Sequence, residues 1–371
     1  MLHIQYAETD VAVIGAGVGG CIAALALAPH YSVTLVDQYQ NPAPKAGECL
    51  PPAALRILKQ LDLTSLLEHE QHLVSHGMVS YWGSDQPVML DNLRNPDGLG
   101  WHVDRQRLET ALRLMCEQRG VTCNWETALT ASEKKLGHWL LNFSHTPQRQ
   151  LQLKAHVVID ATGRSSAFAR QQGARRELDD KLTSCWMTFY SNSVQQMGLL
   201  CPDEQGWWYS APIPNKHGAG LARLLSFQSD SDLYKQTRIR SWVDLLGFAK
   251  KQPALKLLID EMDSTSIQFH GMVAANTSRL SICAGRDWYA IGDAAMSFDP
   301  LSSQGMFNAM ATAMQLCDLI VEFGTKSLDI RNIYSDQLSQ IWTHYQRHKN
   351  YYYSQERRWN NSEFWRRRIN A

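Results

Sequence analysis

The sequence lacks several features that would assign it to a common functional class. Its eight cysteines include no C-x-x-C pair, which argues against a zinc site and against a dithiol redox site. Lysine plus arginine equals aspartate plus glutamate, 36 against 36, so no global charge attracts a nucleic acid. Only one glycine fingerprint of the G-x-G-x-x-G type occurs. The sequence therefore indicates no metal site, no nucleic-acid partner and no separate site for a pyridine nucleotide.

Long apolar runs are also scarce. Residues 11–28 are uncharged and could pass for a signal peptide or a membrane span, but Glu8 and Asp10 precede them where a signal peptide has basic residues. A buried parallel strand followed by a buried helix has the same hydropathy, and we interpret the run in that way. We therefore expect no membrane partner, and the scattered cysteines indicate reduced thiols in a cytoplasmic protein.

The composition that is present suits a folded enzyme. The 371 residues are 44% hydrophobic and 19% charged, values that are typical of globular proteins. Apolar patterning predicts strands over residues 11–15 and 32–37 that flank a helix over residues 20–27, which together make a βαβ unit. Further helices are expected over residues 105–118 and 305–323, and further strands over residues 121–125, 138–143, 156–160 and 288–293. This pattern predicts the α/β fold class (α+β in its second part).

A glycine-rich turn joins the first expected strand to its helix. Gly15 permits a tight turn, Gly17 lets the backbone approach a pyrophosphate, and Gly20 lets the helix pack closely on the strand. The helix N-terminus offers free N–H groups and a partial positive charge to phosphates, and Asp37 would accept hydrogen bonds from a ribose. The residues that we expect to contact the AMP half of a dinucleotide are Gly15, Gly17, Val18, Gly19, Gly20, Asp37 and Gln38.

A second segment, residues 292–306, places an aspartate and a Pro/Ser/Gly loop between a buried strand and a long helix. Asp293 would bind a ribityl hydroxyl, and the helix that begins near Gly305 would direct its positive end at the flavin edge where negative charge collects on reduction. An ordinary loop entering a helix is the alternative interpretation. Taken with the glycine turn, the segment indicates FAD, and its expected contacts are Gly292, Asp293, Gly305 and Met306. Arg105 could also reach the pyrophosphate or the ribityl chain, or it could be a solvated helix residue.

Four stretches of the sequence resemble those of FAD monooxygenases, in the branch that contains the flavin-dependent halogenases. They read G-E-C-L-P-P from Gly47, G-W-W-Y-S-A-P-I-P from Gly206, D-P-L-S-S-Q-G from Asp299 and E-R-R-W from Glu356. More narrowly, the chain resembles the modifying flavoproteins that accompany lysine ε-oxidase and glycine oxidase quinoproteins. The resemblance spans essentially the whole chain, and the Trp-Trp-Tyr stretch and the tail are its most specific parts.

The resemblance implies a p-hydroxybenzoate hydroxylase-like fold, with a Rossmann-type FAD-binding domain, a β-sheet substrate domain and C-terminal helices. The stretch D-A-T-G-R-S at residues 160–165 resembles the strand and turn that pack beneath FAD in this superfamily. We expect a discontinuous FAD-binding domain over residues 1–75, 100–180 and 275–325, a substrate domain over residues 76–99 and 181–274, and a helical tail over residues 326–371.

Two departures argue against halogenation. Halogenases carry W-x-W-x-I-P, whereas here the tryptophans are adjacent and the spacing to Ile213-Pro214 is longer. Halogenases also need a lysine between flavin and substrate, and the only lysine from residue 54 to residue 101 is Lys59, which lies too early in the chain for that role. Hydroxylation is therefore favoured.

The resemblance implies a reaction in which reduced flavin reacts with O2 to give a C4a-hydroperoxide that transfers its distal oxygen to an electron-rich ring. The implied substrate is a tryptophan of a partner protein, the precursor of a quinoprotein amino-acid oxidase, hydroxylated on the way to cysteine tryptophylquinone. The cofactor is FAD, and NAD(P)H or another reductant supplies electrons. The alternatives are an aromatic hydroxylase for small molecules, a halogenase, and a flavoprotein whose main role is to assemble the quinoprotein.

The candidate catalytic residues are Glu48, Trp207, Trp208 and Pro300. Trp207 and Trp208 could form an apolar wall that excludes water from the flavin, or they could be core packing of a β-sheet. Glu48 would lie near the flavin as an acid/base or hydrogen-bonding group, or it could cap a helix. The aromatic and basic tail from residue 341 onward either packs its rings on the body or docks a partner.

Overall fold

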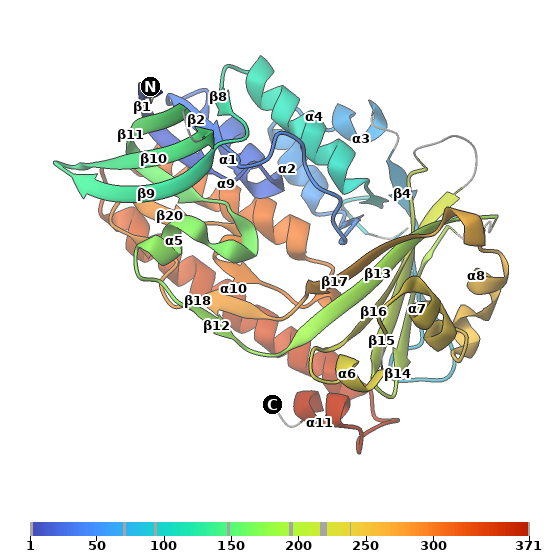
Figure 1. Ribbon diagram of the computed structural model, residues 1–371. Coiled ribbons are helices and arrows are strands. Elements are labelled where there is room, and N and C mark those ends of the chain that lie inside the picture. The colour runs from blue at the N-terminus through green and yellow to red at the C-terminus, as the bar shows by residue number, and fades with distance from the viewer. Residues whose placement is uncertain are drawn as a thin grey trace.

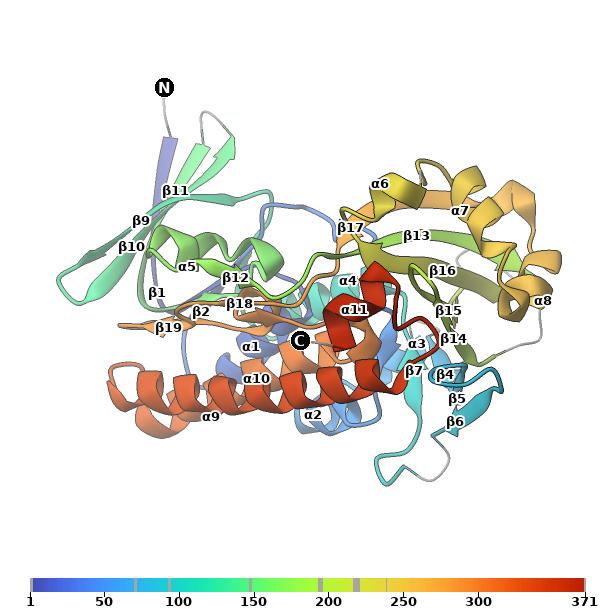
Figure 2. The ribbon, with the colours of Figure 1, turned by 90° about the horizontal axis from the view of Figure 1, so that it is seen from below.

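The computed structural model describes residues 3–69, 72–92, 95–146, 149–192, 196–215, 221–237 and 239–369. Two large β-sheets lie in two lobes, the first at the left of Figure 1 and the second at the right. A long C-terminal helix, α10 (Asp329–Gln355), passes below the first lobe and reaches toward the second (Figure 2).

The first sheet is the parallel, Rossmann-type sheet that the sequence predicts. Its strands are β1 (His3–Ile14), β2 (Val33–Val36), β8 (Thr122–Asn124), β9 (Ala128–Lys135), β10 (His138–Thr146), β11 (Arg149–Asp160), β19 (Ala284–Gly285) and β20 (Trp288–Ala290). The order is β19-β20-β11-β1-β2-β8, and β9 and β10 extend β11 as an antiparallel flap. β1 pairs in parallel with β2 and β11, and β11 pairs in parallel with β20. The predicted α/β class is confirmed.

Helices cover both faces of this sheet (Figure 2). They include α1 (Val18–Leu27), α2 (Ala54–Gln60), α3 (Ser65–His69), α4 (Arg105–Gln118), α5 (Ala167–Gln171) and α9 (Gly305–Phe323). α1 is buried along almost its whole length, because the sheet covers one side of it and α9 another. Burial on several sides explains why its sequence is apolar all round rather than amphipathic.

Several predicted elements differ from the observed ones at their ends. The helix expected from residue 20 begins at Val18, and the strand expected from residue 156 begins at Arg149. The strand expected over residues 288–293 was too long, because Gly292 has a φ of +53° and opens a 3-10 turn over Gly292–Ala294. The helices expected over residues 105–118 and 305–323 have those bounds.

The second sheet is mostly antiparallel, and helices cover one of its faces (Figure 1). Its strands are β5 (Gly77–Ser80), β6 (Val88–Asp91), β13 (Leu182–Ser191), β14 (Gly198–Asp203), β15 (Gly206–Ile213), β16 (Leu221–Asp230) and β17 (Gln268–Ala274), in the order β17-β13-β16-β15-β14-β5-β6. The covering helices are α6 (Tyr234–Thr237), α7 (Trp242–Ala249) and α8 (Lys256–Asp260). They enclose a separate hydrophobic core with the aromatic rings of Trp208 and Phe227.

Two small sheets join the lobes. One consists of β3 (Cys49–Leu50), β7 (Gly100–His102) and β4 (Leu73–Ser75), and the other of β12 (Arg176–Leu178), β18 (Ser278–Leu280) and β21 (Met296–Ser297). In the part of the chain that the structure describes, no helix is both long and apolar enough to cross a membrane. The uncharged run over residues 11–28 forms the end of β1 and the helix α1, as predicted.

The C-terminal tail packs its aromatic rings on the body, which is the first of the two interpretations offered for it. Tyr353 of α10 and the pair Phe364 and Trp365 of α11 (Glu363–Ile369) are at most 1% exposed. The indole of Trp365 donates a hydrogen bond of 2.8 Å to the carbonyl oxygen of Asp203 in β14. The tail therefore holds the second sheet against the first lobe.

We predict that Trp365→Ala lowers the free energy of unfolding by about 3–5 kcal/mol, because it removes a fully buried indole and its hydrogen bond. Trp242→Ala is the control, since that ring is 38% exposed and its loss should cost less than about 1 kcal/mol. Urea unfolding followed by circular dichroism measures both. Equal losses in the two variants would contradict the packing of the tail.

Candidate active site

The glycine turn between β1 and α1 has contacts that only glycine permits. Gly15 has a φ of +102°, and a Cβ on it would lie 2.4 Å from the carbonyl oxygen of Ala161. A Cβ on Gly20 would lie 1.8 Å from the carbonyl oxygen of Gly15. A Cβ on Gly17, in contrast, would meet no described atom within 4 Å. The turn is therefore tight on its inner side and open at Gly17, as backbone approach to a pyrophosphate requires.

The open side of the turn coincides with the N-terminus of α1. Gly17 is its N-cap, without a side-chain cap, and the first turn carries no acidic residue. The N–H groups of Val18 and Gly19 therefore stand at a helix end that has a positive partial charge and no side-chain cap. An anion such as a phosphate is the natural partner of such an end.

Asp37, the expected ribose ligand, lies directly beside this turn. Its Oδ2 accepts a hydrogen bond of 2.7 Å from the backbone N–H of Ala16 and lies 3.1 Å from the guanidinium of Arg113. Arg113 also donates to the carbonyl oxygen of Ala16 at 3.1 Å. The carboxylate thus braces the glycine turn, while its role toward a ribose stays a prediction. Gln38 is exposed next to it.

Arg113 was missed by sequence reasoning. It lies two helical turns after Arg105 on the same helix, and this spacing places both residues on one face, which is the signal that could have found it.

The strand-turn at residues 160–165 packs under the glycine turn. Asp160 is fully buried, and its Oδ1 accepts hydrogen bonds from the backbone N–H and the hydroxyl of Thr162. Its Oδ2 accepts from the N–H of Ala169 at 2.8 Å. Burial raises the pKa of Asp160, and these hydrogen bonds oppose that shift. The carboxyl group organises the turn whose Ala161 touches Gly15 and Gly20.

The two motifs, nearly 300 residues apart in sequence, meet at Ala309 in α9. A Cβ on Gly19 would lie 3.1 Å from the carbonyl oxygen of Ala309, and a Cβ on Gly292 would lie 2.9 Å from its side-chain Cβ. The N–H of Gly292 donates to the hydroxyl of Thr312, one turn further along α9, at 2.9 Å. Small residues at this crossing therefore bring α1, the turn at Gly292 and α9 together.

Asp293 lies beside this crossing with its side chain 42% exposed. Its Oδ2 is 3.8 Å from the Nε of Arg164, and its carbonyl oxygen accepts a hydrogen bond from Arg176. Arg176 also donates to the hydroxyls of Ser166 and Ser278. Arg176 fixes the backbone of the segment and leaves the carboxylate of Asp293 accessible. It was not identified from the sequence, where nothing distinguishes it from a surface arginine.

The loop before α9 is tied to the C-terminal helix. Asp299 is 1% exposed, and its Oδ2 accepts a hydrogen bond of 2.8 Å from the hydroxyl of Tyr353. Its backbone N–H donates to the hydroxyl of Tyr345 at 2.8 Å, and the N–H of Leu301 donates to its Oδ1 at 2.9 Å. Burial raises the pKa of Asp299 to about 6. Pro300, which follows it, is exposed at the loop surface.

The residues of both motifs fit FAD. The N-cap of α9, Gln304, carries no side-chain cap, and a Cβ on Gly305 would meet no described atom within 4 Å. Met306 is buried behind it. Two uncapped helix N-termini, at Gly17 and Gln304, thus offer N–H donors to a pyrophosphate and to a flavin edge. At both helix starts a glycine, Gly17 or Gly305, leaves open the space that a side chain would otherwise occupy.

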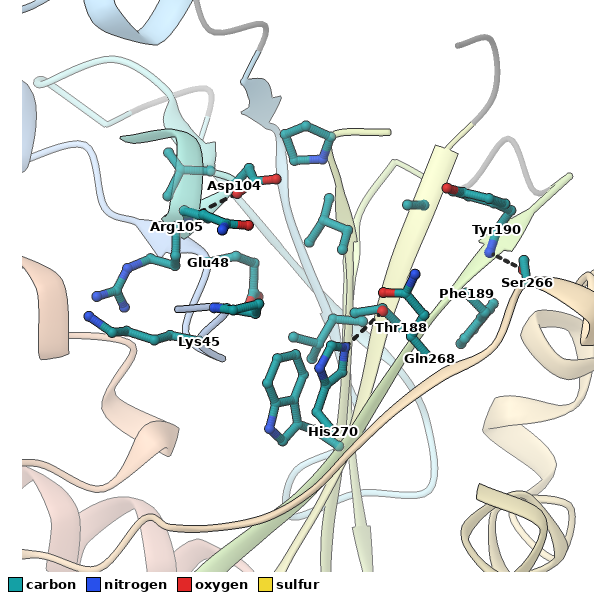
Figure 3. Close-up of a pocket in the computed structure, with 18 residues that line it drawn as sticks. Lys45, Glu48, Asp104, Arg105, Thr188, Phe189, Tyr190, Ser266, Gln268 and His270 are labelled. Atoms are coloured by element: carbon teal, nitrogen blue, oxygen red, sulfur yellow. Dashed lines mark hydrogen bonds between the residues drawn. The ribbon is translucent and has the colours of Figure 1, made fainter. Parts of the chain in front are cut away.

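A cleft opens between this lobe and the second sheet (Figure 3). Its lining comes from the segment around Glu48, from the start of α4 and from β13, β15, β16 and β17. The walls carry both apolar and polar side chains, including Ile213, Pro214, Ala222, Leu224, Thr188, Tyr190, Gln268 and His270. Such a mixture suits an organic ligand that is fixed by a few polar contacts.

Glu48 is the buried carboxylate of this cleft. It is 3% exposed, and its Oε1 accepts a hydrogen bond of 2.6 Å from the hydroxyl of Tyr209 in β15. Its Oε2 has no partner among the described residues. Burial raises the pKa of Glu48, and the hydrogen bond from Tyr209 opposes that shift. The alternative of a helix-capping carboxylate was wrong, because Glu48 precedes a short strand and bonds across the lobes.

Arg105 enters the cleft from the first turn of α4 (Figure 3). It donates to the carbonyl oxygen of Gly47 at 3.2 Å and forms an ion pair of 2.7 Å with Glu109. Lys45 lines the same cleft and also pairs with Glu109 at 2.7 Å. The interpretation of Arg105 as a solvated helix residue is therefore wrong. Lys45 was not predicted, because it precedes residues 54–101, where a lysine between flavin and substrate was expected.

Trp186 and His270 form an aromatic wall of the cleft that the sequence did not indicate. Their rings are stacked, with centroids 3.8 Å apart and planes 9° apart. The Nε2 of His270 lies 3.0 Å from the hydroxyl of Thr188. The register between β13 and β17 shifts at this point, and Gly271 has a φ of +78°, which marks a β-bulge. Bulges re-aim side chains, and this one directs His270 toward the cleft (Figure 3).

Trp207 and Trp208 do not line the cleft. Trp207 packs among the rings of the tail and donates from Nε1 to the hydroxyl of Tyr353 at 3.1 Å. Trp208, the next residue in β15, points to the opposite face and packs on Phe227 in the core under α7. Their alternative interpretation, core packing of a β-sheet, describes both side chains. Tyr209, the third residue of the stretch, is the one that reaches Glu48.

Three buried polar atoms of the cleft lack a partner in the described part of the chain. They are Glu48 Oε2, Arg105 Nε and Trp186 Nε1. A buried donor or acceptor without a partner costs about 1–3 kcal/mol, so such atoms are rare unless a ligand satisfies them. Either a bound molecule or an ordered water satisfies such atoms, and in this cleft they comprise one acceptor and two donors.

Comparison with known proteins identifies the family and the fold. The sequence profile of the family described as "FAD binding domain" matches residues 8–327. The chain is 26% identical to the putative FAD-dependent oxidoreductase LodB of Marinomonas mediterranea, over 97% of this chain and 96% of that protein. It is 24% identical to a menaquinone reductase of Mycobacterium tuberculosis, over 84% of this chain and 76% of the reductase.

Solved structures share the fold. The myxobacterial chondrochloren halogenase CndH superposes with a TM-score of 0.87 at 18% identity, covering 97% of this chain and 86% of the halogenase. The pqsL protein of Pseudomonas aeruginosa, described as a probable FAD-dependent monooxygenase, superposes with a TM-score of 0.75 at 18% identity, covering 98% of this chain and 99% of its own. At these identities the likeness shows the fold alone.

We predict that Gly19→Ala raises the dissociation constant for FAD about tenfold, because the added methyl group forces α1 away from Ala309 and overpacking costs about 1–3 kcal/mol. Gly247→Ala is the matched control, since it also adds a methyl to a helical glycine but meets no described atom within 4 Å. Fluorescence titration of the deflavinated proteins with FAD measures both constants. Unchanged affinity in Gly19→Ala would refute the close contact.

We predict that Asp299→Asn changes the pH dependence of stability. The pKa of the Asp299 carboxyl is about 6 in the folded protein, above its ordinary value of 3.8. The protonated carboxyl therefore adds to the free energy of unfolding below about pH 4, and this contribution is lost as the pH rises through 6. Relative to the variant, the native protein should therefore lose about 2–3 kcal/mol between pH 4 and pH 7. Urea unfolding at both pH values tests this, and a pH-independent difference would contradict it.

Proposed function

The chain belongs to the FAD binding domain family, and we propose that it hydroxylates a tryptophan side chain of a partner protein. The predicted cofactor, FAD, and the predicted class, an FAD-dependent monooxygenase or oxidoreductase, are confirmed at the level of the family. The partner that we propose is the precursor of a quinoprotein amino-acid oxidase, modified on the way to cysteine tryptophylquinone. The resemblance in the Trp-Trp-Tyr stretch and the tail supports this choice.

The observation that carries the proposal is the set of unpartnered atoms beside the stacked rings of Trp186 and His270. An indole is an aromatic ring with one N–H donor. Its N–H would satisfy Glu48 Oε2, while the hydrogen bond from Tyr209 holds the other carboxylate oxygen in place. A hydrogen bond to a carboxylate raises the electron density of the ring, which favours attack on an electrophilic oxygen.

The other two unpartnered atoms suit the rest of a peptide substrate. Trp186 Nε1 and Arg105 Nε are donors, and the backbone carbonyls of a polypeptide are acceptors. His270 lies at the same wall and can take up the proton that the ring carbon releases after hydroxylation. Ile213, Pro214 and Leu224 supply apolar surface that excludes water.

Bound FAD would supply the activated oxygen once it is reduced. The residues that we propose to hold it are those of the two motifs, with Asp37 and Asp293 as the carboxylates and the N-termini of α1 and α9 as the donor sets. The sequence contains a single glycine fingerprint. The reductant is therefore NAD(P)H bound transiently or another electron donor.

Co-expression with an unmodified oxidase precursor tests the proposal. We predict that one tryptophan of the precursor gains the mass of one oxygen atom for each hydroxylation only when this flavoprotein is present. The quinone absorbance, which needs a further oxidation by O2 after hydroxylation, should likewise appear only then. Glu48→Gln should retain FAD and lower maturation at least tenfold, because it replaces a charge-assisted acceptor. Asp293→Ala should abolish maturation by loss of FAD.

Other outcomes would identify a different function. A precursor that matures without this protein, or equally well with Asp293→Ala, would refute the proposal. Rapid NAD(P)H oxidation stimulated by free tryptophan or indole, without modification of the precursor, would indicate an enzyme for small aromatic molecules. Maturation supported by a protein whose flavin resists reduction would indicate an assembly factor.

A further inference from the structure

β17 is an edge strand of the second sheet, and it borders the cleft. It pairs only with β13 among the described strands. The N–H of Ala275 donates to the carbonyl oxygen of Leu182, which fixes the alternation of hydrogen bonds along this antiparallel pair. By that alternation the backbone N–H and C=O groups of Met272 and Ala274 point away from β13. Neither residue's backbone meets a partner among the residues that the structure describes.

The same residues are open to solvent. The side chains of Met272 and Val273 are 45% and 41% exposed, and Ala274 is also exposed. No charged side chain or proline occurs in the strand, although these are the usual protections of an edge against pairing with another chain. The outer end of β17 is therefore an unprotected, apolar strand edge.

The bulge at Gly271 divides β17 into two parts with different surroundings. Gln268 and His270, before the bulge, line the cleft (Figure 3). Met272 to Ala274, after the bulge, form the exposed edge. The bulge also fixes the register of β17 against β13, so the exposed edge stays at a fixed distance along the strand from the residues that line the cleft. Edge and cleft are thus continuous along one strand.

The opposite edge of the sheet gives a useful contrast. β6 is also exposed and apolar, with Met89 66% exposed. The N–H of Asn92 donates to the carbonyl oxygen of His76, and by the same alternation the N–H of Met89 points outward. β6 is separated from β17 by the other strands of the sheet and contributes no residue to the cleft. An edge alone therefore does not distinguish β17, whereas its continuity with the cleft does.

We propose that the edge of β17 at Met272 to Ala274 binds an extended segment of the partner polypeptide as an added strand, next to the tryptophan that enters the cleft. This inference rests on the proposed function, because it takes the substrate to be part of a protein. Backbone donors and acceptors in a row are satisfied by another strand, which a free aromatic molecule cannot supply.

The dimensions fit this arrangement. Paired strands advance about 3.3 Å per residue, so three or four paired residues extend about 10–13 Å. The cleft wall begins two residues before Met272, at His270. A residue just beyond the paired segment therefore reaches the cleft. Strand addition fixes the depth and direction of the substrate chain, while the cleft selects the aromatic side chain.

Met272→Pro tests the proposal, because proline removes the outward N–H and its ring obstructs an added strand. We expect binding of the unmodified oxidase precursor to weaken about tenfold, and its maturation to fall in step, while FAD content stays native. Met89→Pro is the matched control, with the same substitution at an outward N–H of the other edge, and it should bind and mature the precursor like the native protein.

Hydrogen–deuterium exchange of the native protein gives a second readout that needs no variant. With the precursor added, the amides of Met272 and Ala274 should exchange at least tenfold more slowly, and the amide of Met89 should not change. Normal binding and maturation with Met272→Pro, or no protection at β17, would overturn strand addition while leaving the hydroxylase intact. Protection that appears with protein concentration alone would overturn it in favour of a second copy of this chain.

The two proposals fail separately. If the native protein does not modify the precursor, the proposed function is wrong whatever the edge does. If the native protein modifies it and Met272→Pro does so equally well, only the docking strand is wrong.

Discussion

The close approach of three backbone segments at Ala309 is the constraint on which the site depends. Gly19 of α1 and Gly292 of the later turn both lie where a side chain would collide with this residue. A larger residue at any of the three positions would separate two motifs that lie almost at opposite ends of the chain. The dinucleotide turn and the flavin segment can form one site because the residues where they meet, Gly19, Gly292 and Ala309, have small side chains or none. Asp160 orders the turn whose Ala161 lies against Gly15 and Gly20, and Arg176 binds the carbonyl oxygen of Asp293.

Local pattern predicted those parts of the fold that local physics determines. The βαβ unit and the helix over residues 305–323 follow from apolar periodicity and from glycine at helix starts, and both are present. The cleft could not be predicted in this way, because its wall depends on which strands become neighbours. Trp186 and His270 are 84 residues apart and meet only through the pairing of β13 with β17. Neither residue has a local signal.

The Trp-Trp-Tyr stretch also shows that local sequence does not determine which side chains contact the site. Its residues alternate between the two faces of β15, so Trp207 and Tyr209 share one face and Trp208 lies on the other. Trp207 and Trp208 pack in two separate cores, and of the three only Tyr209 forms a hydrogen bond with Glu48 of the cleft. The stretch does contact the site, but through Tyr209 rather than through the two tryptophans named as candidates.

The hydrogen bonds from Trp207 to Tyr353 and from Tyr353 to Asp299 have a consequence for synthesis of the protein. A ribosome makes Asp299 well before Tyr345 and Tyr353, yet the loop at Asp299 takes both of its buried phenol contacts from them. The entrance to α9 is therefore completed only after the tail has been translated and has packed. A chain that stopped short of α10 would have both nucleotide motifs in its sequence and still lack the support of the loop between them. The loop between the two motifs thus has its buried phenol contacts only when residues 345 and 353 are present and packed.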